Sequence, residues 1–290
     1  MDDRPRAHAL PAGFGRVVVA VLLVAACGGR TAEDEARESP WVSGAAGGAD
    51  ASGGAAAFSG GGAGGVASGG AAGVAGCAGR PSPAMVPVAS VLGVACMDVT
   101  EVTNADYAVF LASAPSVAMQ PAACADNASF APAFGWPASA AHASFPVVNV
   151  DWCDARAFCA WAGKRLCPGS FATPESASAS AWTAVCTGSG TRDYPYGKTY
   201  MPAACNGKDD GPGEAVSAGA DASCVGSGVF DLSGNVWEWE DACESDAPDA
   251  RCRVRGGSFR SDGNNLSCAA SFADTRMTTF DDFGFRCCAD

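Results

Sequence analysis

Fifteen cysteines constrain what this chain can fold into more than any other feature of its 290 residues. Their spacings are irregular and no CxxC pair occurs, which is not the pattern of a cysteine metal cluster. Cysteines at this density are typical of oxidising compartments, where thiols are joined as disulfides. The sequence therefore predicts a disulfide-rich fold outside the cytoplasm.

The N-terminus has the pattern of a processing signal. Arginines precede an apolar run over residues 17–26, which is too short to span a bilayer. Small residues then lead to Cys27, as in a bacterial lipoprotein signal, where the cysteine is lipidated; an ordinary secretory signal is the alternative. We expect an extracytoplasmic protein anchored through Cys27 to a bacterial membrane, at the outer membrane or cell surface. Fourteen cysteines then remain, enough for seven disulfides.

Composition divides the rest of the chain in two. Residues 28–76 are rich in Gly, Ala and Ser and contain few large side chains, so they cannot bury enough apolar surface to offset the entropy of ordering. We expect a disordered tether there, after a signal at 1–27. Residues 77–290 have a globular composition, and their length suits one domain.

Charge and histidine content exclude several classes of function. The formal net charge is −13 and no basic stripe occurs, which argues against nucleic acid as a partner. Of two histidines, His8 would be lost with the signal. His142 alone cannot form a two-histidine iron or zinc site, and we expect it in a surface loop.

Two segments have the pattern of a strand followed by a helix. In residues 98–113, Thr103 is the expected N-cap, with an acidic residue three positions later. In the second, valines over residues 147–150 predict a strand, and a helix begins near Asp151 or Asp154.

Residues 228–239, GVFDLSGNVWEW, are too irregular for one helix or one strand. Asp231 and Glu238 flank a turn at Gly234–Asn235, so two carboxylates and several carbonyls can converge on one hard cation. The alternative is a tight turn that carries core tryptophans.

Six motifs follow one another from about residue 100 to the end of the chain: EVTN (101–104), PVVNVDWCDARAFCAWAGKRL (146–166), YPYG (194–197), GVFDLSGNVWEW (228–239), RVRGGSF (253–259) and FGFRC (283–287). They occur in the order found in the sulfatase-modifying-factor family, whose founding members are formylglycine-generating enzymes, and the chain resembles that family over this length. The resemblance implies a compact, irregular α+β fold of the C-type-lectin-like kind, with little regular secondary structure and structural calcium.

By position, the resemblance implies a first calcium site with the side chains of Asp231 and Glu238 and the carbonyls of Gly234 and Val236. Two other interpretations stay open: Asp231 caps a turn, and Glu238 pairs with an arginine.

A second calcium site would use Asn206, the carbonyl of Gly207, Asp210 and the carbonyl of Pro212. The loop differs in length from the family's, so this register is less fixed. The alternative is a solvated acidic loop at 208–214.

The resemblance also implies disulfide pairs. Cys288 is expected to bridge away from its neighbour, for example to Cys167, and local pairs are open to the remaining cysteines. The implied pairs are Cys159–Cys287 and Cys186–Cys268, and the permitted local pairs include Cys205–Cys224 and Cys243–Cys252.

The loop that would form the active site differs from the family's in its residues. Formylglycine-generating oxidases carry two cysteines shortly after the Gly-Gly-Ser segment, which bind copper(I) as thiolates. This chain has no cysteine between Arg253 and Ser267, and serine cannot replace a thiolate in redox chemistry. Copper is therefore not expected. Counted from either flank, the family's positions fall near Ser258, Ser261, Gly263 and Leu266.

The same loop offers polar groups for a ligand. Ser261, Asp262, Asn264 and Asn265 can bind hydroxyls of a sugar or a peptide. We expect a lipid-anchored, non-oxidase domain that binds a glycan, a peptide or an envelope protein. The alternative is a formylglycine-generating oxidase, which would need another thiol pair. The adjacent cysteines Cys287 and Cys288 are the obvious candidates for such a pair.

Overall fold

The computed structural model describes residues 77–290. The expected signal, the tether and Cys27 lie outside the described residues. Among the described residues, none of the helices has the length and apolar character needed to cross a membrane.

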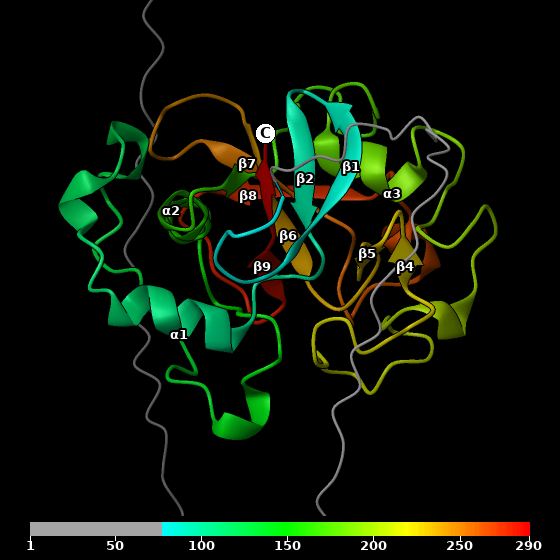
Figure 1. The fold of residues 1–290 in the computed structure, drawn as a ribbon, viewed down its shortest axis with the longest axis horizontal. Coiled ribbons are helices and arrows are strands. Elements are labelled where there is room, and N and C mark those ends of the chain that lie inside the picture. Colours follow the sequence, from blue (N-terminus) through cyan, green and yellow to red (C-terminus); the bar gives the residue numbers. More distant parts are fainter. Residues whose placement is uncertain (1–76) are drawn as a thin grey trace, which may run out of the picture. The chain divides into compact units, whose positions relative to one another are not determined.

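Two four-stranded sheets, a two-stranded sheet of β4 and β5, and three α-helices form the described domain, so its class is α+β, as predicted. One four-stranded sheet has the order β1-β2-β10-β3 and the other the order β8-β7-β6-β9 (Figure 1). Five short 3₁₀ helices lie in the loops of the described part. The strands are β1 (Met85–Val91), β2 (Val94–Asp98), β3 (Arg165–Leu166), β4 (Val225–Gly226), β5 (Val229–Phe230), β6 (Trp237–Cys243), β7 (Arg251–Arg255), β8 (Ser271–Thr275), β9 (Phe283–Phe285) and β10 (Cys287–Ala289). The helices are α1 (Asn104–Ala112), α2 (Trp152–Trp161), α3 (Ala181–Thr187), η1 (Val117–Met119), η2 (Ala122–Cys124), η3 (Ala140–His142), η4 (Pro202–Ala204) and η5 (Gly263–Leu266).

Capping boxes begin the first two helices. The Thr103 side chain accepts from the Asp106 amide before α1, and the Asp151 side chain accepts from the Asp154 amide before α2. In both helices the acidic residue at the third position accepts in return from the cap's amide. The predicted cap at Thr103 is confirmed. The second helix was expected to begin near Asp151 or Asp154, and in the structure its N-cap is Asp151.

The strand predicted over residues 147–150 is wrong. Asn149 has a φ of 59°, which interrupts an extended run before it can join a sheet. Within the described residues, the segment has an isolated bridge between Thr103 and Pro146 and single backbone hydrogen bonds, such as that from the Val147 amide to the Val102 carbonyl (2.9 Å). Its valines still enter the core, where Val147 and Val150 are buried.

The core lies in two main clusters. One packs α1 and α2 against Trp239, Phe283 and Phe285, and the other packs α3 against β2 and Leu232. Figure 1 shows α2 and α3 on opposite sides of the strands.

Seven disulfides join all fourteen cysteines of the described residues. They include the two pairs that the resemblance implied, the two local pairs, and Cys167–Cys288. Cys287 and Cys288 in β10 bridge to α2 and to the residue after β3, so the last strand is tied to both. The pairs are Cys77–Cys96, Cys124–Cys153, Cys159–Cys287, Cys167–Cys288, Cys186–Cys268, Cys205–Cys224 and Cys243–Cys252.

Candidate functional site

The pairing of the second sheet brings distant residues to one face. β6 and β9 are parallel, with Trp237 opposite Phe283, and β7 pairs with β8 so that Phe272 stands opposite Val254. The loop over residues 258–267, which follows β7, closes the same region. Residues far apart in sequence therefore meet beside this loop.

A cavity of about 490 Å³ lies there, and we call it the β8 cavity. Three of the four ligand-binding residues predicted from sequence, Ser261, Asp262 and Asn265, line it, whereas Asn264 is exposed and is not part of its wall. The sequence reasoning missed the rest of the wall. The other lining residues are Lys208, Trp237, Arg260, Ser271, Phe272, Asp274, Phe280, Asp282 and Phe283.

Protein contacts hold the cavity's loop in place. The Ser258 hydroxyl donates to Asp282 Oδ2 (2.8 Å), and the Ser258 amide donates to the Ser261 hydroxyl (3.0 Å). Leu266 is buried, and a Cβ added at Gly257 would lie 3.0 Å from its side chain. Gly263 packs closely on Tyr200, whose ring would lie 2.8 Å from an added Cβ. Gly263 and Leu266 therefore act in packing.

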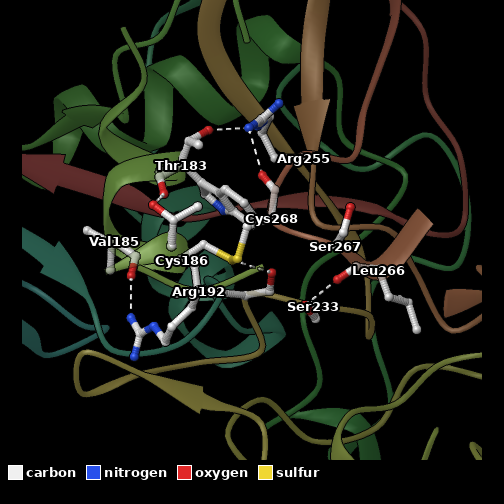
Figure 2. Close-up of a disulfide and its surroundings, with 12 residues drawn as sticks. Thr183, Val185, Cys186, Arg192, Ser233, Arg255, Leu266, Ser267 and Cys268 are labelled. Atoms are coloured by element: carbon white, nitrogen blue, oxygen red, sulfur yellow. Dashed lines mark hydrogen bonds between the residues drawn. A yellow bond between two sulfur atoms is a disulfide. The ribbon is translucent and has the colours of Figure 1, made fainter. Parts of the chain in front are cut away.

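The end of the loop is fixed by a disulfide. Figure 2 shows Cys268 joined to Cys186 of α3, with the Arg255 guanidinium donating to the Thr183 hydroxyl and to the Cys268 carbonyl (3.1 Å). The Ser233 hydroxyl donates to the Leu266 carbonyl (2.5 Å). These contacts preorganise the cavity wall.

Behind the cavity, Glu238 forms a buried ion pair with Arg286. The guanidinium donates to both carboxylate oxygens (2.6 and 2.7 Å), and the Trp182 indole donates to one of them (2.9 Å). Burial alone would lower the pKa of Arg286, but the Glu238 charge holds it above its usual range. Glu238 therefore pairs with an arginine in the structure, which was the alternative to its predicted role as a calcium ligand.

Two further carboxyl groups lie beside this pair. Asp231 accepts from the Gly219 amide (2.6 Å), and Glu101 accepts from the Asn235 side chain (2.9 Å). Burial, followed by the Asp231 charge, raises the pKa of Glu101 well above its usual value.

The first predicted calcium site does not fit a calcium ion in this arrangement, because both oxygens of Glu238 are used by Arg286. Gly234 packs on the carbonyl of Asn206, and Val236 is buried. Among residues 77–290, no three His, Cys, Asp or Glu side chains are grouped to hold a metal ion.

The second predicted calcium loop fits better. Asn206 is 6% exposed, and its Oδ1 has no hydrogen-bond partner in the described part of the chain. A Cβ placed on Gly211 would lie 2.1 Å from this oxygen and 2.7 Å from the Gly207 carbonyl oxygen, so the two oxygens face one point. Asp210 and Pro212 are exposed at the rim of the same loop.

Comparison with known proteins shows which family the chain belongs to. Residues 89–290 match the sulfatase-modifying factor enzyme 1-like domain. The chain belongs to this family. A relative named inactive C-alpha-formylglycine-generating enzyme 2, from Bos taurus, is 35% identical over 161 residues, which are 49% of this chain and 50% of the relative. A formylglycine-generating enzyme from Mus musculus is 31% identical over 176 residues, 50% of this chain and 44% of the relative.

This member of the sulfatase-modifying factor family spans about half the length of the curated relatives it matches. Among solved structures, PvdO from Pseudomonas aeruginosa aligns with a TM-score of 0.45 and 19% identity, over 70% of this chain and 89% of that chain. The likeness to PvdO concerns the fold alone.

Proposed function

We propose that this family member is a non-oxidase, extracytoplasmic domain, lipid-anchored through Cys27, which binds a peptide, glycan or envelope protein in the β8 cavity. The anchor would hold it at a bacterial outer membrane or cell surface. The −13 charge disfavours nucleic acid as the partner.

One observation carries the non-oxidase part of the proposal. Where the resemblance implies a cysteine pair, the chain has Ser261 and Leu266 when counted from Gly257, or Ser258 and Gly263 when counted from Cys268. Every cysteine of residues 77–290 is in a disulfide. Copper(I) chemistry needs thiolates, and a bridged cysteine supplies none.

The shape and chemistry of the β8 cavity support the binding part. Its volume of about 490 Å³ lies in the range of small-ligand pockets. Four aromatic side chains and eight polar or charged ones line it, so it offers both apolar contact and groups for hydrogen bonds and ion pairs. The fixed loop lowers the entropic cost of binding.

Calcium is proposed as a structural ion in the loop 206–212 only. The unpartnered oxygen of Asn206 and the carbonyl of Gly207 would supply ligands, with Asp210 and the carbonyl of Pro212 in addition. When bound, the ion would stabilise the loop, because oxygen ligands of this kind suit calcium.

The second candidate is a formylglycine-generating oxidase. The relative from Mus musculus that bears this name favours it. The obvious alternative thiol pair does not support it, because Cys287 and Cys288 are both bridged.

A turnover assay tests the proposal. The purified protein is incubated with copper(I) and a cysteine-containing, sulfatase-type peptide, and conversion to formylglycine is followed by mass spectrometry. We expect no conversion above the copper-only control. Conversion that depends on the protein overturns the non-oxidase assignment.

A further inference from the structure

The geometry points to a basic side chain, the lysine or arginine of a peptide or protein, as the group that the β8 cavity binds. This inference rests on the proposed binding function and narrows its ligand to one class. Three features of the cavity support this inference: its charge, its aromatic walls and its fixed loop.

Carboxylates outnumber cations around the cavity. Asp262, Asp274 and Asp282 line it, against Lys208 and Arg260. The Arg260 charge is already compensated, because its guanidinium donates to both oxygens of Asp281 (2.8 Å each). It also lies 3.6 Å from Asp282. The surplus negative charge therefore favours a cationic ligand and repels an anionic one.

The walls suit an organic cation. Phe272 and Phe280 are 46% and 44% exposed, and the centroid of the Phe283 ring lies 6.5 Å from that of Phe272 and 4.9 Å from that of Phe280. Trp237 completes the aromatic wall. Aromatic faces attract ammonium and guanidinium groups, and the attraction strengthens as water is excluded.

Other ligands match the cavity less well. A bare metal ion needs converging ligands, and residues 77–290 hold no group of three acidic or metal-binding side chains arranged for one. A neutral sugar could stack on the rings but would leave the aspartates without a counter-charge. A basic side chain uses both the rings and the carboxylates.

The aspartates are oriented before any ligand arrives. Asp274 Oδ1 accepts from the Thr275 amide (2.7 Å) and the Thr278 hydroxyl (2.9 Å). Asp262 caps η5, where its Oδ1 accepts from the Asn265 amide (3.4 Å). Asparagine at either position keeps an acceptor oxygen and removes only the charge, which makes both substitutions clean probes.

The experiment compares two blocked tripeptides, acetyl-Gly-Arg-Gly-amide and its citrulline isostere, by calorimetry and by intrinsic tryptophan fluorescence at low salt. We expect the arginine peptide to bind roughly tenfold or more tightly than the citrulline peptide, as for hydrogen bonds between charged groups. Added salt should weaken this preference.

Asp274→Asn and Asp262→Asn should each lower the affinity for the arginine peptide several-fold. Asp249→Asn removes the same charge from an exposed position outside the cavity wall and should leave it unchanged. Near-ultraviolet circular dichroism checks that each variant folds.

Three results overturn the inference: equal affinity for both peptides, no binding of either, or binding that both cavity variants leave intact. If the citrulline peptide binds in the cavity as tightly as the arginine peptide, or a saccharide binds there more tightly than either, the cationic ligand is overturned and the proposed binding function is kept. The turnover assay decides the non-oxidase part separately.

Discussion

Replacing Arg286 by methionine is the sharpest test of the buried charge cluster. Besides Glu238, the guanidinium donates to the carbonyls of Asp98 (3.1 Å) and Phe230 (2.8 Å). Methionine is uncharged and fills part of the same space. The variant leaves the Glu238 carboxylate buried without its counter-charge and two carbonyls without their donor.

The expected loss of stability is about 3–5 kcal/mol, the usual cost of removing one partner from a buried ion pair. The Glu238 and Arg286 side chains are each 1% exposed, so water cannot replace the missing partner. Adding Glu238→Gln to Arg286→Met should recover part of the loss, because it removes the unpaired charge.

Urea unfolding with the disulfides intact, followed by tryptophan fluorescence, measures these changes. Arg251→Met is the control for an exposed arginine. Its contact with Glu244 is 4.0 Å long, it also donates to the Ala273 carbonyl (2.9 Å), and water can replace both contacts because the Arg251 and Glu244 side chains are about half exposed. The control should cost no more than about 1 kcal/mol. A similarly small loss for Arg286→Met, or no recovery in the double variant, would refute the reasoning.

Three further predictions concern calcium, the anchor and pH. If the loop 206–212 holds calcium, a chelator should lower the melting temperature of the wild type, and Asn206→Ala should remove that response while Asp231→Ala keeps it; a chelator-insensitive wild type contradicts the site. Cys27→Ser should release the protein from the membrane fraction, and continued sedimentation with membranes would argue against lipidation. Burial raises the pKa of Asp151 to about 6, so folding favours its protonated form and stability should fall as pH rises from about 4 to 6. Asp151→Asn keeps the cap and should reduce that fall by about 1–3 kcal/mol; an unchanged pH profile, measured by urea unfolding, would count against it.

Features that depend on residues close together in the chain could be predicted from the sequence. The cap at Thr103 depends on residues three positions apart, which hydrogen-bond whenever a helix begins there. His142 is exposed at the surface as expected, although it ends the short helix η3 instead of lying in a loop.

Partners far apart in sequence could not be predicted in the same way. Glu238 lies beside Arg286 because β6 and β9 pair in parallel, a register that no local pattern encodes. Lys164 pairs with Asp98 (2.6 Å), which is 66 residues away. Such contacts depend on the topology of the whole sheet.

The wall of the β8 cavity was missed for the same reason. Phe272 and Asp274 share one face of β8, and their alternation in SFADT is the only local signal that they point the same way. Their meeting with Trp237 depends on two strand registers and a disulfide-anchored loop. The sequence shows which residue types are present, but not which of them the fold brings together in one cavity.

The central claim, that no thiol pair is available for oxidase chemistry, is tested most directly by counting free thiols in the purified, unreduced and denatured protein. Alkylation and peptide mapping should find no free thiol among the fourteen cysteines from Cys77 to Cys288, and the native protein should not bind copper(I). Two alkylated cysteines in that range, in a protein that takes up copper(I), would contradict the account.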